Sequence, residues 1–201
     1  MIHSNDRGWW LGGSDASFVT GNWETDTFKK WWRSKVGLSI GDKFNNKYTL
    51  AGTYYEHAIL DTIPGVIKDK QIKLPEYGLR VNYDGITDRE TIKIHEVKTH
   101  KADKEFKVSK IYWRQAQVEI FAAEIYYGKP VELDIVSYPL TEEHYKNYFL
   151  PIDRKMVCRT PIEKSSIFIG DLIPKLLYLK HCMKIGSFPT EEDYEKFNIT
   201  K

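Results

Sequence analysis

Apolar and polar residues alternate along two neighbouring stretches in the middle of the chain, which predicts a β-hairpin over residues 79–99. A polar link over residues 87–90 suits the turn between the two strands. The rest of the predicted fold is arranged around this hairpin. The apolar positions of the alternation are Leu79, Val81, Tyr83, Ile92 and Ile94.

The second strand of this hairpin breaks its own pattern near its end. Residues two apart in a strand share a face, so Glu96 and Lys98 point the same way as Ile92 and Ile94. Charges on a buried face are costly unless they are paired or bind a metal ion. An exception of this kind indicates a functional site.

Helical periodicity predicts a helix on each side of the hairpin. The first covers residues 53–63, carries Glu56 at the edge of its apolar stripe and ends at Pro64-Gly65. The second covers residues 109–127 and has Gln117 within its stripe. A glutamine on an apolar face needs partners, so Gln117 is either satisfied within the structure or faces a substrate.

The ends of the chain add further helices, and strands are predicted over residues 66–78 and 131–135. Two glycines precede Ser14 and Asp15, which predicts a helix capped by one of these two residues, and helix N-termini bind phosphate readily. Asp171 and Thr190 are candidate caps for two C-terminal helices, the first of which ends at Gly186. This order predicts a single α/β or α+β domain, residues 1–201, with a mixed central sheet flanked by helices and a C-terminal helical extension from about residue 165.

The composition argues against some classes of function. The 201 residues are 41% hydrophobic and 29% charged with a net charge of +2, so any phosphate binding has to be local. Cys158 and Cys182 are far apart, which disfavours a cysteine-based metal site and suits a reduced cytoplasmic location. No signal peptide or membrane-length apolar run is present in the sequence, so no membrane association is expected. The basic link His100–Lys107 is either a solvated loop or a contact with a nucleic-acid backbone.

Three carboxylates and a lysine suggest chemistry: Glu56 on a helix, Asp84 and Glu96 on paired strands, and Lys98 beside Glu96. Carboxylate oxygens suit Mg²⁺ or Mn²⁺, which keep waters and substrate phosphate in their remaining positions. One such ion activates a water, and two clamp the attacking and leaving oxygens of a phosphodiester. Lys98 would orient or deprotonate the water, or stabilise the charge that develops on phosphorus.

These residues resemble the PD-(D/E)XK nuclease signature, and the surrounding blocks resemble its phage lambda exonuclease and YqaJ-type viral recombinase branch. Four blocks occur in the family's order over roughly residues 7–121, whereas Asn82-Tyr83 replaces the small or proline residues that usually precede the aspartate. The blocks are Arg7 with Gly12-Gly13-Ser14-Asp15-Ala16-Ser17, then Gly52 with Glu56 and Ala58, then Asp84-Gly85 with Glu96-Val97-Lys98, and finally Tyr112-Trp113-Arg114-Gln115-Ala116-Gln117.

The resemblance implies a restriction-endonuclease-like core and a role for each matching residue. Asp84, Glu96 and the Val97 carbonyl would bind Mg²⁺ or Mn²⁺, two ions per site, with help from Glu56, and Lys98 would lie at the attacking water. Gln117 would position water or substrate. The residues implied in holding phosphate or DNA are Arg7, Ser14, Ser17 and Gln115.

Three classes of function remain open from the sequence. The first is a Mg²⁺-dependent exonuclease that digests double-stranded DNA ends 5′ to 3′ in phage-type recombination, with a single-strand annealing protein as its partner. The family forms rings of three subunits, so the resemblance allows a homotrimer. The second class is a structure-specific or restriction-type endonuclease on the same core, which would cut covalently closed circular DNA. The third is a DNA-binding protein without catalysis.

Overall fold

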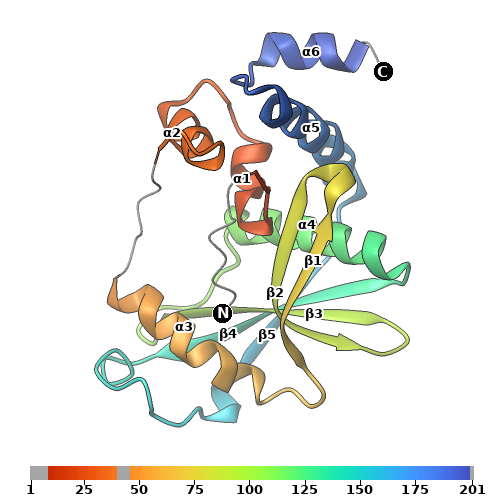
Figure 1. The fold of residues 1–201 in the computed structure, drawn as a ribbon. Helices are drawn as coiled ribbons and strands as arrows, with labels where there is room; N and C mark the ends of the chain where they lie inside the picture. The colour runs from red at the N-terminus through yellow and green to blue at the C-terminus, as the bar shows by residue number, and fades with distance from the viewer. Residues whose placement is uncertain (1–8, 40–45, 200–201) are drawn as a thin grey trace.

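The computed structural model describes residues 9–39 and 46–199. A mixed sheet carries helices on both faces, as the sequence predicts (Figure 1). The strands are β1 Ile67–Leu74, β2 Leu79–Asp88, β3 Ile92–Lys101, β4 Val131–Leu140 and β5 Cys158–Ile162. The α-helices are α1 Ala16–Val19, α2 Asp26–Lys35, α3 Lys47–Leu60, α4 Lys110–Tyr127, α5 Ser166–Ile185 and α6 Glu191–Ile199. The 3₁₀ turns are η1 Gly13–Asp15, η2 Pro75–Tyr77 and η3 Arg154–Met156.

The strands lie in the order β1-β2-β3-β4-β5, and every neighbouring pair is antiparallel except the parallel pair β3 and β4. A parallel pair needs a crossover connection, and α4 supplies it. The predicted hairpin is therefore confirmed as β2 and β3, and the strand predicted at 131–135 is the start of β4. Strand β5 was missed because it is short, largely exposed, contains Pro161 and shows no alternation.

Two apolar cores lie on opposite faces of the sheet. The larger contains α4, α5 and the N-terminal helices, together with Ile92 and Ile94 of β3. The smaller joins α3 to Val97 and Val136. Adjacent residues of β3 thus face different cores, and Glu96 lies on the same face as Ile92 and Ile94.

Trp23 and Trp32 belong to the larger core rather than to an exposed surface, whereas Trp9 is half exposed. Trp23 and Trp32 are fully buried, and their indole nitrogens donate hydrogen bonds to the Val19 and Ser187 carbonyls. Such bonds let a large amphipathic ring be buried without an unsatisfied N–H group.

Two helices begin earlier than predicted. Helix α3 starts at Lys47 because the Asn46 side chain accepts hydrogen bonds from the backbone N–H groups of Tyr48 and Thr49. Helix α5 starts at Ser166 with Ser165 as its cap, so Asp171 lies inside the helix and the cap predicted there is wrong. Pro174 is accommodated within α5.

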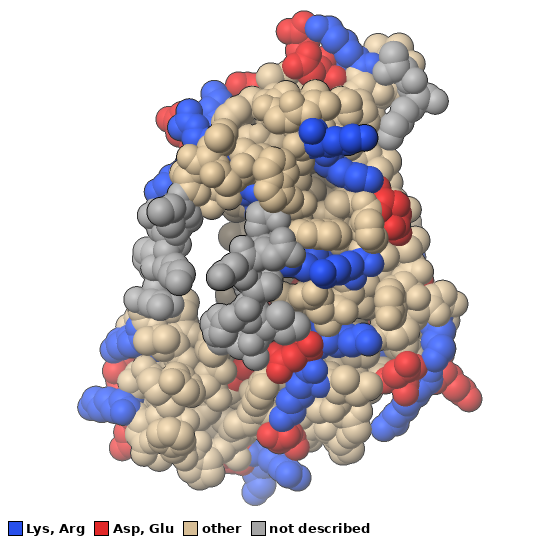
Figure 2. Space-filling view, viewed as in Figure 1, with Lys and Arg blue, Asp and Glu red and all other residues tan. Residues whose placement is uncertain are grey.

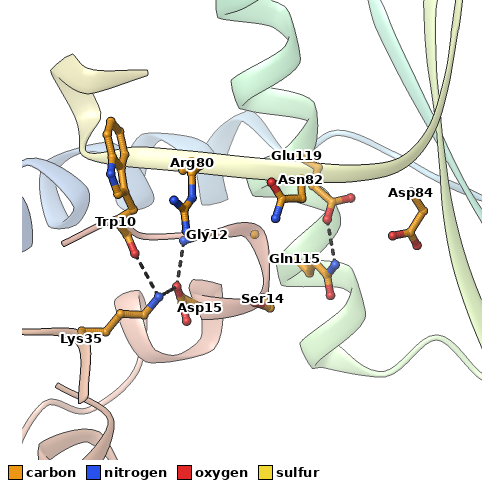
Figure 3. Close-up of a pocket in the computed structure, with 11 residues that line it drawn as sticks. Trp10, Gly12, Ser14, Asp15, Lys35, Arg80, Asn82, Asp84, Gln115 and Glu119 are labelled. Atoms are coloured by element: carbon orange, nitrogen blue, oxygen red, sulfur yellow. Dashed lines mark hydrogen bonds and ion pairs between the residues drawn. The ribbon is translucent and has the colours of Figure 1, made fainter. Parts of the chain in front are cut away.

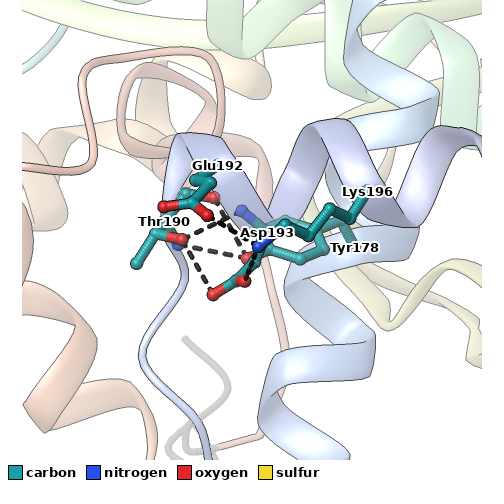
Figure 4. A network of polar contacts seen from close by, with 5 residues as sticks. All are labelled: Tyr178, Thr190, Glu192, Asp193 and Lys196. Carbon is teal, nitrogen blue, oxygen red and sulfur yellow. Dashed lines mark hydrogen bonds and ion pairs between the residues drawn. The ribbon is translucent and has the colours of Figure 1, made fainter.

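Helix α6 is attached to α5 by a polar network (Figure 4). The Tyr178 hydroxyl donates to the Thr190 carbonyl and accepts from the Thr190 N–H, each at 3.1 Å. The Thr190 hydroxyl accepts from the Asp193 N–H at 3.1 Å, as the predicted cap requires. The C-terminal helices are therefore joined to the rest of the domain through α5, whose buried residues belong to the larger core.

Charged side chains of both signs are interspersed over the face seen in Figure 2, in keeping with the small net charge. Among the described residues, none of the helices combines the length and the apolar character that a membrane span requires.

Replacing Tyr178 by Phe should lower the free energy of unfolding by about 1–2 kcal/mol, because both backbone groups of Thr190 lose their partner. Denaturant unfolding followed by circular dichroism measures this loss. Tyr126→Phe is the matched control, since Tyr126 is half exposed on α4. Equal stability of the two variants would show that the network does not hold α6.

Candidate active site

The candidate site lies where β2 and β3 part. Their pairing begins at Asp88 and Ile92 and ends at Gly85 and His95, and β2 then continues beside β1, with a bridge from Leu11 to Leu79 near its start. The Asp84 carboxylate lies at this point and accepts the Val97 N–H at 2.8 Å. The Asp84 side chain thus replaces the backbone hydrogen bond between strands that Val97 of β3 would otherwise form with β2.

Glu96 and Lys98 occupy the open side of β3. The Lys98 ammonium lies 2.5 Å from Glu96 Oε1, and Glu96 is almost fully buried. The Gln115 amide of α4 donates to the same Glu96 oxygen at 2.6 Å. The sequence-predicted residues Asp84, Glu96, Lys98 and Gln115 are therefore brought together by two strands and one helix.

Glu119 is a site residue that sequence reasoning missed. It lies one helical turn after Gln115, whose amide also donates to Glu119 Oε1 at 2.8 Å. Glu119 is buried, and its second oxygen has no hydrogen-bond partner within the part of the chain that the structure describes. The available signal was a glutamate within a strongly apolar part of the helix, two residues after Gln117.

Burial and mutual repulsion disfavour ionisation of the carboxyl groups gathered here. Burial raises the pKa of Asp84 well above its usual range, and the nearby Glu96 and Glu56 raise it further. Burial and Glu96 likewise raise the pKa of Glu119, and more moderately that of Glu56. Burial lowers the pKa of Lys98, but Glu96 and Asp84 outweigh this effect and raise it overall.

This donor set fits a divalent metal ion. Glu96 Oε2 and Glu119 Oε2 are buried oxygens without a partner among the described residues, and Asp84 lies beside them in the electrostatic cluster. A hard cation would neutralise the repulsion and take up free oxygens. Glu56 also belongs to a more exposed group with His57 and Asp69, whose ligand atoms lie within 4.8 Å of one another.

Gln117 does not face this cluster, in contrast to the role expected for it. It is fully buried on another side of α4, where its amide nitrogen donates to the Glu163 carbonyl at 2.9 Å and its oxygen accepts from the Ser165 N–H at 2.7 Å. It fixes the segment that leads into α5. The glutamine that reaches the cluster is Gln115, two residues earlier on the helix.

A cavity of about 260 Å³ opens beside Asp84 (Figure 3). Its wall includes Ser14, Lys35, Arg80 and Asn82 as well as Gln115 and Glu119. Ser14 therefore lies in a cavity that also contains two cationic side chains, neither of which was predicted from the sequence. Arg7 lies outside the described residues, and Ser17 does not line the cavity; its hydroxyl is buried without a hydrogen-bond partner among the described residues.

The loop that carries Ser14 is held by Asp15. The Asp15 carboxylate accepts the Gly12 N–H at 2.8 Å and the Trp31 indole N–H at 3.0 Å, and it pairs with Lys35 at 2.5 Å. Asp15 is the N-cap residue of α1, as predicted, but its side chain makes no capping hydrogen bond to that helix and reaches back to Gly12. Asp15 instead acts as an ion-pair partner that positions the loop and Lys35 together.

The fold is that of known exonucleases. No family model and no curated protein matches the sequence. Among solved structures, the alkaline exonuclease LHK-Exo from Laribacter hongkongensis aligns over 96% of this chain and 95% of its own, with a TM-score of 0.64 and 19% identity. A phage-related exonuclease from Haemophilus somnus aligns over 89% of this chain and 96% of its own, with a TM-score of 0.59 and 16% identity. The resemblance stated from the sequence is thereby confirmed for the fold.

Gly13 is required for the contact between the loop and α4. A Cβ atom at Gly13 would lie 2.9 Å from Glu119 Oε1 and 3.2 Å from Glu119 Cγ. Because Glu119 is buried, Gly13→Ala should lower the free energy of unfolding by about 1–3 kcal/mol. The control is Gly170→Ala in α5, where a Cβ meets nothing within 4 Å. Denaturant unfolding compares the two, and equal effects would contradict the close approach.

Proposed function

We propose that this protein is a metal-dependent exonuclease that hydrolyses phosphodiester bonds at the ends of linear double-stranded DNA, in the 5′-to-3′ direction. The observation that carries the proposal is the position of Asp84. It belongs to the carboxylate cluster with Glu96 and Lys98, and it also lines the cavity that contains Lys35 and Arg80. The cluster that would carry out the reaction and the cavity that would hold the anionic end of a DNA strand are thus adjacent.

The residues predicted from the sequence have the following roles in this proposal. Asp84, Glu96 and the Val97 carbonyl would hold Mg²⁺ or Mn²⁺, with Glu56 as a further ligand, and the bound ions would supply Lewis acidity and an activated water. Lys98 is kept protonated by its carboxylate neighbours, which suits it to stabilise negative charge on the phosphate that is attacked. Gln115 keeps Glu96 in place and takes the positioning role first expected of Gln117.

The cavity beside Asp84 would hold the terminal 5′-phosphate. Lys35 and Arg80 supply positive charge, and the Ser14 hydroxyl supplies a hydrogen bond. One structure of LHK-Exo contains dAMP, a deoxynucleoside monophosphate, which is the class of product that an exonuclease releases. The 3′ single strands left by this digestion would be the substrate of a single-strand annealing protein, and a homotrimer would keep the enzyme on its strand.

The direct experiment compares linear duplex DNA with a 5′-phosphate, the same duplex with a 5′-hydroxyl and covalently closed circular DNA, each with Mg²⁺. We expect loss of the linear DNA only, fastest from the phosphorylated end, and no digestion when EDTA replaces Mg²⁺. Nicking or linearisation of the circle would identify an endonuclease instead. Full turnover in EDTA would remove the metal from the proposal.

Replacing Lys98 by Ala should slow cleavage by about 10²-fold or more, because a charged group aimed at the reacting phosphate is lost. DNA should still bind when binding is measured in EDTA. Lys129→Ala is the control, since Lys129 is exposed and pairs with Asp88 at the far end of β2. An unchanged single-turnover rate in the Lys98 variant would exclude it from the reaction.

A further inference from the structure

A second and larger hollow adjoins the carboxylate cluster, and the proposed function does not account for it. Its volume is about 610 Å³, and it lies between the start of α3 and the end of β3. Glu56, Val97 and Lys98 form its inner end, whereas Asp84 lines the smaller cavity that contains Lys35. The two hollows therefore flank the same cluster. We call this larger hollow the tyrosine groove.

The lining of the tyrosine groove combines aromatic rings with positive charge. Tyr48, Tyr112 and Tyr145 come from α3, α4 and the segment after β4. The lining contains three lysines, Lys98, Lys101 and Lys104, and one carboxylate, that of Glu56. Lys101 and Lys104 belong to the basic link that the sequence left undecided between a solvated loop and a nucleic-acid contact. Aromatic side chains along a positively charged groove are typical of sites that bind a single nucleic-acid strand.

Each of these rings already carries an ammonium group, and the Lys47 nitrogen lies 5.1 Å from the centroid of Tyr48 and 5.6 Å from that of Tyr145. The Lys101 nitrogen lies 4.9 Å from the centroid of the Tyr48 ring, and the Lys98 nitrogen lies 5.0 Å from that of Tyr112. At exposed sites such contacts are weaker than the stacking of a nucleobase on an aromatic ring. The Tyr48 ring also packs edge-on against Tyr145, which holds it in place. A base can therefore replace the flexible lysine side chains on Tyr48 and leave the Lys101 ammonium group free to pair with a phosphate.

The dimensions of the groove favour an unpaired strand. Lys98 and Lys101 are three residues apart on β3, so about 10 Å of strand separates them. Gly52 leaves the floor open, because a Cβ atom there would lie 3.2 Å from the Thr99 hydroxyl. A hollow of 610 Å³ encloses a ligand of drug size, which corresponds to one or two nucleotides and not to a base-paired duplex.

We propose that the tyrosine groove binds unpaired DNA on the 3′ side of the phosphate that is cut, with a base stacked on Tyr48 and a phosphate paired with Lys101. This proposal rests on the proposed function, because the cluster and the phosphate cavity define which side of the strand enters the groove. Affinity for the strand then depends on the bases beyond the cut, and not on the terminal phosphate alone.

The test measures binding in EDTA, where no cleavage is expected, by fluorescence anisotropy. The probes are a short 5′-phosphorylated oligodeoxynucleotide and the same oligonucleotide with abasic sites at its second and third positions. Tyr48→Ala should weaken binding of the first probe roughly tenfold and leave binding of the abasic probe unchanged. Tyr48→Phe should restore binding of the first probe, because the ring remains.

Lys101→Gln should weaken binding of both probes and reduce the slope of log K against log salt concentration by about 0.7, as the loss of one phosphate contact predicts. The controls are Tyr54→Ala, on the same helix but stacked on Tyr148 outside the groove, and Lys107→Gln, in the same basic link but paired with Glu105. Neither control should change affinity or slope.

Two results would overturn the proposal: equal weakening of both probes by Tyr48→Ala, or an unchanged salt slope in Lys101→Gln. Either result leaves the proposed exonuclease intact if the wild-type protein still digests linear DNA with Mg²⁺. Conversely, the expected binding pattern in a protein that digests no DNA would support the groove as a single-strand site while the proposed activity fails. The two proposals can therefore fail separately.

Discussion

The structure depends on the point at which β2 leaves β3. The backbone N–H and C=O groups of a strand inside a sheet normally form hydrogen bonds with both neighbouring strands. Separating two strands leaves such groups without partners. Here the Asp84 carboxylate takes the N–H of Val97, and the chain before α1 takes part of the freed edge of β2 through Leu11. The gap is thereby stabilised, and side chains from both strands can face each other across it.

The gap also concentrates negative charge. The buried Glu96 and Glu119 and the half-buried Asp84 would not be stable together as three carboxylates without compensation. Lys98 and the Gln115 amide supply only part of this compensation. The raised pKa values of Asp84 and Glu119 reflect the uncompensated free energy of ionising these carboxyl groups close together. A site with this cost gains most from a divalent cation, and so the same residues that strain the fold are those that suit phosphodiester chemistry.

The sequence predicted the parts of the fold that are encoded locally. Alternation located β2 and β3, and the two charges on an apolar face located Glu96 and Lys98, because a strand has only two faces to choose from. It could not distinguish Gln115 from Gln117, since a helix turns by about 100° per residue and the neighbours of each face are set by tertiary packing. For the same reason the sequence did not predict that Lys35, Arg80 and Asn82 line one cavity, because their proximity depends on how η1 lies against β2.

The segment that lines the cavity beside Asp84 is also part of the sheet. The N–H of Leu11 donates to the Gly78 carbonyl and the Leu11 carbonyl accepts from the Arg80 N–H, so the wall of the cavity and the edge of β2 form together. Any ligand that binds in this cavity would therefore also stabilise this edge of the sheet. A ligand that holds Ser14 and Lys35 would add its binding free energy to the stability of the sheet, so that an enzyme engaged with a DNA end would be a more stable protein than a free one.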